Sequence, residues 1–219
     1  MAWNPKKGFY ISPVVLDAPW EEELSNIDTV QGKHLNRACL EDRGFDDYLT
    51  FLSFKSHDGN PETKPAIAGK GEVPEDFQWT SLYHDNPILK SLIDWFPVEK
   101  TRVRLARAAP NGYLKPHFDW DNQRHDFNPD EHQIRIWIQL SEGENWYRFT
   151  DGISDINIRL ERGQFIILDP DQVIHATENR SDTPRDNIII NAKTNHWVRC
   201  VPDLFTKYIK LDPRNSDPQ

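Results

Sequence analysis

The sequence has little cysteine, lacks a long apolar run and carries more acidic than basic side chains. Its two cysteines, Cys39 and Cys200, stand far apart, which excludes a cysteine-ligated zinc site and a disulfide framework. No apolar run approaches the roughly 18 residues of a membrane helix, and no apolar segment follows the N-terminal lysines to form a signal peptide. These absences favour a soluble, cytoplasmic protein in a reducing compartment.

The net charge is −9 at pH 7, from 35 acidic and 26 basic side chains. Because an acidic chain repels phosphate backbones, we expect no nucleic-acid partner. The lack of a long apolar run predicts that there is no membrane partner. The 37% hydrophobic and 11% aromatic residues are enough for a packed core, and 219 residues fit one domain better than two. A small-molecule substrate is the expected partner, and the sequence leaves the oligomeric state open.

We expect a single domain, 1–219, in which the pattern of apolar and polar residues changes along the chain. Residues 1–100 mix helical and strand patterns, residues 101–193 are rich in strand patterns, and residues 194–219 predict a C-terminal helix and tail. The expected elements outside the strand-rich part are a strand at 8–12 and helices at 20–27, 87–96 and 202–211.

The helix at 87–96 has the clearest boundaries, because Pro87 suits a first turn and Pro97 follows its end. Asp85 or Asn86 is the expected N-cap residue.

Short runs of alternating apolar and polar residues, rich in β-branched side chains, fill the part of the chain after Thr101. Such runs predict half-buried antiparallel strands, and Asn111-Gly112 and Arg162-Gly163 supply turns between them. We therefore expect a mainly β fold with flanking helices, either a sandwich or a jelly roll. The runs are residues 102–108, 134–140, 156–160, 164–168 and 187–191.

Three side chains in this part have the chemistry of a metal site. His117 and Asp119 stand two residues apart, so on a strand they project from the same face. His175 supplies a second imidazole. Two imidazoles and one carboxylate on one side of a metal leave coordination positions open, as in non-haem Fe(II) oxygenases. The sequence therefore predicts an iron site at His117, Asp119 and His175.

Arg185 follows His175 by ten residues and stands at the entrance to the last predicted strand of the β core. A fixed guanidinium at that place can pair with the distal carboxylate of a dicarboxylic 2-oxo acid through two parallel hydrogen bonds. Arg185 is the predicted co-substrate residue.

These motifs arrive in an order that resembles the aspartyl/asparaginyl β-hydroxylase family of Fe(II)/2-oxoglutarate-dependent dioxygenases. The resemblance covers about residues 100–192, and the family includes bacterial free-amino-acid hydroxylases such as the cis-proline hydroxylases. The segments that carry it are residues 102–107, 110–119, 135–140, 160–164, 175–182 and Arg185.

The resemblance implies a double-stranded β-helix of the jelly-roll, cupin-like type. It implies His117, Asp119 and His175 as iron ligands, with Arg185 and Arg135 at the co-substrate. The cofactors implied are Fe(II), 2-oxoglutarate and O2, and ascorbate is expected to help in vitro. The reaction implied is hydroxylation of an unactivated carbon.

Two departures from the family pattern bear on the substrate. Trp137 occupies the position of a histidine that helps to bind the keto acid in the eukaryotic β-hydroxylases, and those enzymes lack the metal carboxylate that Asp119 would supply here. Both departures point to the small-molecule branch, with a free amino acid or a derivative as substrate.

The substrate-contacting residues are expected on the strand at 102–108 and near the metal. The loop at 121–133 follows the metal motif and is a predicted lid. The candidate substrate residues are Arg102, Arg104, Arg107, Trp120 and Trp137, with Trp146 as a further candidate for the pocket wall.

Two other functions remain open at the level of sequence. One is a protein or peptide hydroxylase of the aspartyl-asparaginyl type, for which a long open groove would be expected. The other is a cupin-like metal-binding protein that does not consume 2-oxoglutarate, and such a protein has no need of a cation at Arg185.

Overall fold

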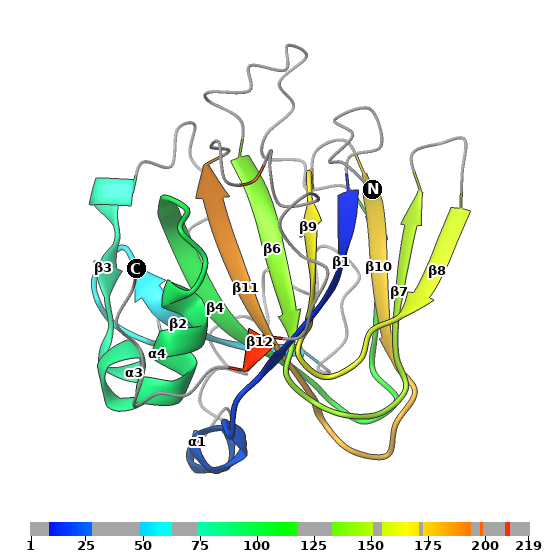
Figure 1. The fold of residues 1–219 in the computed structure, drawn as a ribbon, viewed down its shortest axis with the longest axis horizontal. Coiled ribbons are helices and arrows are strands. Elements are labelled where there is room, and N and C mark those ends of the chain that lie inside the picture. Colours follow the sequence, from blue (N-terminus) through cyan, green and yellow to red (C-terminus); the bar gives the residue numbers. More distant parts are fainter. Residues whose placement is uncertain are drawn as a thin grey trace.

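Two β-sheets face each other in the computed structural model, which describes residues 9–27, 49–62, 74–117, 133–150, 155–170, 173–193, 198 and 209–210 (Figure 1). The eight-stranded major sheet has the strand order β12-β1-β9-β6-β11-β4-β2-β3, and the four-stranded minor sheet has the order β5-β10-β7-β8. The major-sheet strands are β1 (Phe9–Asp17), β2 (Leu49–Ser56), β3 (Gln78–Trp79), β4 (Lys100–Ala108), β6 (Gln133–Gln139), β9 (Gln164–Leu168), β11 (Arg185–Lys193) and β12 (Ile209–Lys210). The minor-sheet strands are β5 (Tyr113–His117), β7 (Asn145–Thr150), β8 (Asp155–Arg159) and β10 (Ile174–Asn179), and the helices are α1 (Glu21–Asn26), α3 (Ser81–Asp85), α4 (Pro87–Asp94) and the short 3-10 helix η1 (Pro74–Asp76).

The eight consecutive strands from β4 to β11 are divided equally between the two sheets. Strands β4, β6, β9 and β11 lie next to one another in the major sheet, and β5, β7, β8 and β10 form the minor sheet. All of these neighbours pair antiparallel. This connectivity is a double-stranded β-helix, so the predicted mainly β jelly roll is confirmed.

Both faces of the major sheet are buried, which explains why its strands read as nearly continuous apolar runs. In β6, Ile134, Ile136 and Ile138 point outward into the larger hydrophobic core, whereas Trp137 points inward to the minor sheet. In β9, Phe165 and Ile167 are in the outer core and Ile166 and Leu168 in the inner one. The inner face holds the candidate site.

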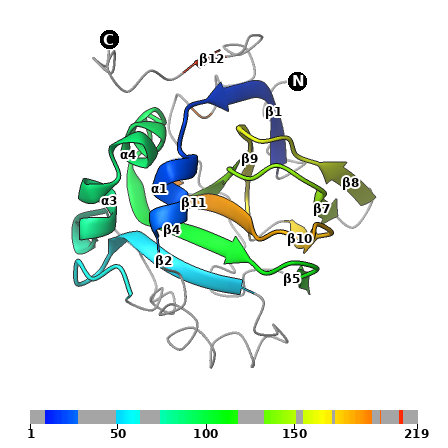
Figure 2. The ribbon, with the colours of Figure 1, turned by 90° about the horizontal axis from the view of Figure 1, so that it is seen from below.

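Helices cover the outer face of the major sheet. Figure 2 shows α1, α3 and α4 on the side of β4 and β11 opposite to the minor sheet. Leu89, Leu92 and Ile93 of α4 are fully buried against Val103 and other outward residues of the sheet. Among the described residues, no helix is long and apolar enough to cross a membrane.

The N-terminus of α4 is capped from another helix rather than by its own flanking residue. Asn86 is the N-cap residue, but its side chain makes no capping hydrogen bond. Instead, the Glu23 carboxylate of α1 accepts hydrogen bonds from the backbone N–H groups of Ile88 and Leu89, each at 2.8 Å. A carboxylate there satisfies two otherwise unpaired donors and complements the helix dipole.

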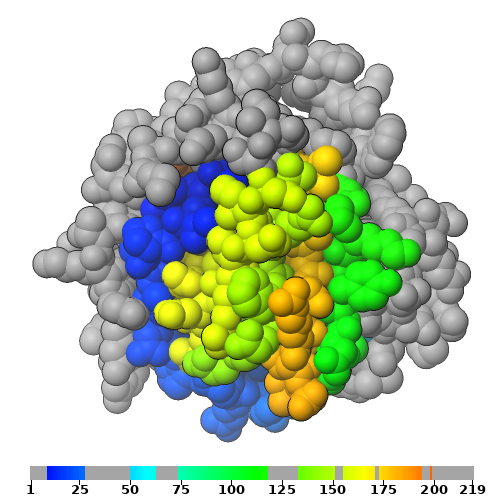
Figure 3. All heavy atoms as spheres, turned by 90° about the vertical axis from the view of Figure 1, so that its right-hand side faces the viewer, coloured from blue at the N-terminus to red at the C-terminus, as the bar shows by residue number. Residues whose placement is uncertain are grey.

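The minor sheet has one buried and one solvent face. β8 alternates exposed and half-buried residues. Its outward charges pair with residues in or next to β7, as in Asp155 with Arg148 and Arg159 with Glu144. Figure 3 views this outer face, where β5, β10, β7 and β8 lie side by side. A charged surface of this kind suits contact with water.

The turn at Gly163 lets β1 approach the start of β9. Its φ of +84° lies in the left-handed region, and a Cβ atom there would lie 1.9 Å from the Leu16 carbonyl oxygen. The backbone N–H of Leu16 donates to the Gly163 carbonyl at 2.9 Å. Only glycine fits this close approach.

Most of the predicted elements are confirmed, with two differences at the ends of the chain. The first strand runs through Pro13 to Asp17, because it lies at the side of β9 and its pairing shifts register between Ile11 and Val15. The last helix was predicted to include Ile209 and Lys210, but these residues pair parallel with β1 as β12. The rest of that predicted helix lies outside the described residues.

Candidate active site

His117 and His175 lie opposite each other on neighbouring strands of the minor sheet. They are register partners between β5 and β10, and their ring centroids are 4.3 Å apart. His175 points into the roll and is only 1% exposed, whereas His117 is half-buried at the end of β5. The structure therefore brings together the two imidazoles that the sequence predicted as metal ligands.

Hydrogen bonds fix the chemical form of both rings. His117 Nδ1 lies 2.8 Å from the Lys115 carbonyl oxygen, and His175 Nδ1 lies 3.0 Å from the Val173 carbonyl oxygen. Because a carbonyl oxygen only accepts, Nδ1 carries a hydrogen in each ring, and Nε2 has the lone pair when the ring is neutral. Metal-bound histidines commonly have such a backbone partner on the other ring nitrogen, so this pair fits a metal ion.

Asp119, the third predicted ligand, lies outside the described residues. Within the part of the chain that the structure describes, no group of three or more His, Cys, Asp or Glu side chains could hold a metal ion. The described half of the candidate site is thus two imidazoles, with the carboxylate two residues beyond the end of β5 in sequence.

Arg185 is the first residue of β11 and is 3% exposed. Its Nη2 donates to Thr177 Oγ1 at 2.8 Å, and its guanidinium carbon lies 5.2 Å from the centre of the Tyr147 ring. Within the described residues, Nε and Nη1 are buried without a hydrogen-bond partner, and no carboxylate pairs with the guanidinium. A buried cation in this state lacks the counter-ion that normally offsets its desolvation.

The Tyr147 ring that supports Arg185 is held by a closed set of hydrogen bonds. Its hydroxyl donates to Gln139 Oε1 at 2.7 Å and accepts from Asn187 Nδ2 at 2.8 Å, and Asn187 also donates to Gln139 at 2.9 Å. Burial raises the pKa of Tyr147, and the nearby Arg185 charge and the Asn187 hydrogen bond act in the opposite direction. These contacts fix the ring plane below the guanidinium.

Strand register places Arg185 at a defined depth from the histidines. Thr177 follows His175 by two residues on the same face of β10, a separation of about 7 Å along a strand. Because Arg185 contacts Thr177, the guanidinium lies deeper in the roll than the imidazoles by a distance comparable to a five-carbon diacid. A ligand that contacts the imidazoles and the guanidinium at the same time must span this distance.

Arg135 lies at the other end of β11 from Arg185. It is the register partner of Asn191, to which its Nε donates at 3.2 Å, and Asn191 follows Arg185 by six residues, or about 20 Å of strand. The structure therefore does not bring together the two arginines that were predicted at the co-substrate. They stand on opposite sides of the row that contains Trp137 and Ile189.

Arg102 and Arg104 are buried on the inner face of β4. Arg104 is the register partner of Ile189, which in turn pairs with Trp137, so all three side chains share one row across the major sheet. The Arg104 guanidinium also lies 5.1 Å from the centre of the Phe51 ring. Both arginines thus face the same space as the histidines.

The three candidate tryptophans have different placements. Trp137 is 4% exposed, meets the His175 ring edge-on at 5.4 Å, and has a buried indole N–H without an acceptor among the described residues. Trp120 lies outside the described residues. Trp146 points to the outer face of the minor sheet, where it bonds Glu144 and contacts Arg180, so the prediction that it lines the pocket is wrong.

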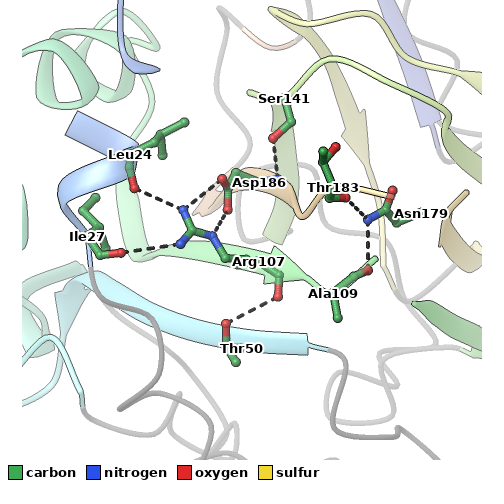
Figure 4. A network of polar contacts seen from close by, with 9 residues as sticks. All are labelled: Leu24, Ile27, Thr50, Arg107, Ala109, Ser141, Asn179, Thr183 and Asp186. Carbon is green, nitrogen blue, oxygen red and sulfur yellow. Dashed lines mark hydrogen bonds and ion pairs between the residues drawn. The ribbon is translucent and has the colours of Figure 1, made fainter. Parts of the chain in front are cut away.

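Arg107 does not join the other arginines of β4. It lies an odd number of residues from Arg104 and therefore points to the outer face, where it pairs with Asp186 through bonds of 2.7 and 3.0 Å. It also donates to the Leu24 and Ile27 carbonyls at the end of α1 (Figure 4). This placement corrects the prediction of Arg107 as a substrate residue, because its guanidinium joins α1 to β11 away from the inner face.

The sequence analysis did not identify four residues of the site: Thr177, Tyr147, Gln139 and Asn187. A signal existed for Thr177, which stands two residues from His175 and thus shares its strand face. Tyr147 belongs to β7, a strand that the sequence analysis did not predict. Its contact with Arg185 depends on the pairing of β7 with β10, which the sequence does not state.

No protein-family profile matches the sequence, and no curated protein matches it. Among solved structures, the Drosophila melanogaster CENP-C cupin domain is 13% identical with a TM-score of 0.31, covering 41% of this chain and 56% of that chain. The capsular polysaccharide assembling protein CapF from Staphylococcus aureus is 14% identical with a TM-score of 0.32, covering 42% of this chain and 24% of that chain.

An oxalate oxidase in complex with the substrate analogue glycolate is 15% identical with a TM-score of 0.32, covering 43% of this chain and 42% of that chain. The match spans less than two thirds of each of these three chains. The fold assignment therefore comes from the strand connectivity described above, and the site chemistry from the side chains themselves.

Proposed function

We propose that this protein is an Fe(II)- and 2-oxoglutarate-dependent oxygenase that hydroxylates an unactivated carbon of a small substrate. The observation that carries the proposal is Arg185, a buried guanidinium without a carboxylate partner in the described part of the chain. Its contact with Thr177 places it about 7 Å along β10 from His175. A diacid that binds a metal at one end and Arg185 at the other would neutralise this buried charge.

His117 and His175 would hold the metal through Nε2, together with Asp119. Arg185 would bind the distal carboxylate of the co-substrate, with the Tyr147 ring below the guanidinium. When bound, a ferrous ion with 2-oxoglutarate supplies the activation of O2, and the overall reaction converts 2-oxoglutarate, O2 and R–H to succinate, carbon dioxide and R–OH.

The residues of the chain orient the reactants and exclude water. Trp137 meets the His175 ring, and Phe149 and Ile166 belong to the same buried hydrophobic cluster as Trp137. These apolar side chains would keep bulk water from the inner end of the site. Arg102, Arg104 and Arg135 lie on the same inner face as Arg185. Arg104 is in the row of Trp137, which meets the His175 ring, and Arg135 is on the side of this row away from Arg185. We assign these three arginines to an anionic group of the substrate.

A small anionic metabolite, such as a free amino acid or a derivative, is the favoured substrate because Arg102 and Arg104 are buried on the inner face. A protein or peptide hydroxylase is the second candidate, and it predicts turnover with a long peptide and none with free amino acids. A third candidate is a cupin-like metal-binding protein without oxygenase activity. For such a protein, we expect a metal affinity that does not change when 2-oxoglutarate is added.

The proposal is tested by a screen of free amino acids and short peptides with Fe(II), ascorbate and 2-oxoglutarate. The expected result is substrate-stimulated formation of succinate and a product heavier by one oxygen atom. In parallel, 2-oxoglutarate is titrated into protein loaded with Mn(II). A protein that binds the metal but does not bind 2-oxoglutarate would overturn the proposal, whatever the screen shows.

A further inference from the structure

Strand β8 stands at one end of the minor sheet and pairs on one side only. Its partner is β7, and within the described residues no strand pairs with its other edge (Figure 1). The backbone N–H of Leu160, the residue that follows β8, donates to the Asn145 carbonyl of β7 at 3.1 Å. β8 therefore has one bonded edge and one open edge.

The alternation of the backbone decides which groups of β8 face the open edge. In an antiparallel pair, successive residues direct their N–H and C=O groups alternately to the two sides of the strand. Because Leu160 bonds to β7, Ile158 and Ile156 direct their backbone groups to β7 as well. The backbone donors and acceptors at the open edge belong to Asp155, Asn157 and Arg159.

The side chains of β8 are self-complementary about Asn157. Asp155 and Arg159 stand two residues to either side of it and have opposite charges, and an isoleucine occupies each position between. A second copy of the strand can run antiparallel along the open edge with the two Asn157 residues opposite each other. Each Asp155 then faces an Arg159. Each Ile156 faces an Ile158, so this register places no like charges opposite each other.

We propose that the open edge of β8 is a homodimer interface, in which two copies of this chain pair their β8 strands antiparallel about a two-fold axis at Asn157. A two-fold axis presents the same strand from both copies, as the self-complementary sequence requires. Each facing pair of edge residues exchanges two backbone hydrogen bonds, and the two minor sheets become one continuous sheet. The inference is independent of the proposed function, because the residues of β8 do not belong to the candidate active site.

The ion pairs on the outer face of the minor sheet support a second copy as the partner. Asp155 pairs with Arg148, and Arg159 Nη1 lies 3.0 Å from Glu144 Oε1. In the proposed dimer, Asp155 of one copy lies beside Arg159 of the other. The charges across the interface then alternate in sign, in the order Arg148, Asp155, Arg159, Glu144. Charges on an edge strand ordinarily keep other strands away, whereas here they attract an identical strand in one register.

The two isoleucines of β8 support the same arrangement. Both are half-buried on the inner side of the strand, and Ile158 packs against the hydrophobic cluster that contains Phe149. In the dimer, Ile156 of one copy covers Ile158 of the other. Cross-strand pairs of β-branched side chains stabilise a sheet, so the contact extends the inner cluster across the interface.

The test reverses the charge at either end of the strand. Asp155→Arg and Arg159→Asp each place like charges opposite each other in a homodimer. A mixture of the two variants restores opposite charges in the heterodimer, at both ends of the strand. Lys90→Asp is the matched control, because it breaks an exposed ion pair with Asp94 on α4, away from β8.

Asn157→Pro tests the backbone in the same assay. It removes the N–H group at the two-fold axis, which faces the open edge, and leaves the hydrogen bonds to β7 in place. Sedimentation velocity at protein concentrations from about 1 to 200 μM gives the dissociation constant of the dimer, and thermal unfolding verifies that each variant is folded.

We expect a wild-type dimer with a dissociation constant of about 1–50 μM, as for a small interface. Each charge reversal should weaken the homodimer by at least about tenfold, and Asn157→Pro should do the same. The mixture of Asp155→Arg with Arg159→Asp should dimerise within about threefold of the wild type, and Lys90→Asp should dimerise like the wild type.

A wild-type protein that stays monomeric over the whole concentration range would overturn the interface. So would a dimer that both charge reversals leave unchanged, because the contact would then lie elsewhere on the molecule. A mixture of the two variants that dimerises no better than each variant alone would exclude the register about Asn157.

Discussion

His117 and His175 are paired on adjacent antiparallel strands, and each donates its Nδ1–H to a backbone carbonyl two residues earlier in the chain. The two carbonyl groups therefore set the tautomer of both rings before any ligand binds. Such pre-organisation lowers the cost of bringing two Nε2 atoms to one ion.

Removal of either imidazole should abolish tight metal binding. We expect His175→Ala and His117→Ala each to weaken Mn(II) or Fe(II) binding by at least about 100-fold, because a direct ligand matters more than the outer partners. The measurement is metal titration by calorimetry, with succinate formation as a second readout. His84→Ala, an exposed histidine in α3, is the matched control, and an equal loss in all three variants would contradict the assignment.

Arg185→Met should separate stability from function. The variant removes a buried charge that has no carboxylate partner in the described part of the chain. Its ligand-free form is expected to be as stable as the wild type or more stable, by up to about 3 kcal/mol. Its affinity for 2-oxoglutarate should fall by at least about 100-fold, a loss of about 2.7 kcal/mol, with metal affinity retained.

Denaturant unfolding and 2-oxoglutarate titration of the metal-loaded Arg185→Met variant provide the two measurements. Arg162→Met is a control in arginine content, since Arg162 stacks on Trp20 and pairs with Asp17 on the outer side of the roll. Unchanged 2-oxoglutarate affinity in the Arg185 variant would refute the co-substrate assignment.

Arg107→Met is expected to lower stability without a direct effect on ligand binding. Asp186 would lose a partner held at 2.7 Å, and its side chain is only 9% exposed. Breaking such a pair leaves a carboxylate nearly buried, and partial solvent access to Arg107 reduces the cost to about 2 kcal/mol. Chemical denaturation measures this loss.

Asp186→Asn tests the same ion pair from its other side, and the double variant gives the coupling energy. The Arg107→Met substitution should leave the preference among substrates unchanged, since the Arg107 guanidinium bonds to α1 and β11 on the outer face. A variant with changed substrate preference and unaltered stability would contradict this placement and support Arg107 as a substrate residue.

Lys100 should make stability rise with pH in the alkaline range. Burial lowers the pKa of Lys100 from 10.5 to about 8, against a smaller opposing effect of Asp94. Between these two values the unfolded chain binds more protons than the folded protein, so the free energy of unfolding increases with pH. Lys100→Met should remove this increase.

The measurement for Lys100 is the free energy of unfolding from pH 7 to pH 10, compared between the wild type and Lys100→Met. Lys90→Met is the control, because hydrogen bonds to Asp94 and Tyr83 raise the pKa of Lys90 and shift its effect in the opposite direction. A wild-type curve that falls in parallel with that of Lys100→Met would contradict the lowered pKa.

Much of the β core was predictable because its strands carry local signals. The runs at 134–140 and 164–168 correspond closely to β6 and β9, and the turn glycine Gly163 stands where predicted. β7 was missed, although its inward residues Tyr147 and Phe149 alternate with outward ones. Short strands with one polar face give a weaker periodic signal than strands buried on both faces.

The candidate site was predictable to the extent that it follows single strands. Residues two apart on one strand share a face, which is how Arg102 and Arg104 were grouped correctly and how Thr177 could have been found beside His175. The prediction of Arg107 as a substrate residue was wrong for the same reason, because Arg107 is three residues from Arg104 and an odd spacing places it on the opposite face of the strand. Partners from different strands, such as Arg185 with Tyr147, depend on register that is set by long-range packing.

The sequence by itself determined the strand periodicity, the mainly β class and the residue types available for metal and carboxylate binding, because these depend on spacing within short segments. The tertiary structure alone decided that His117 meets His175, that Arg185 is buried beside Thr177 and Tyr147, and that Arg135 lies far from Arg185. The physical reason is that pairing between distant strands is fixed by the burial of whole faces, which single residues do not encode.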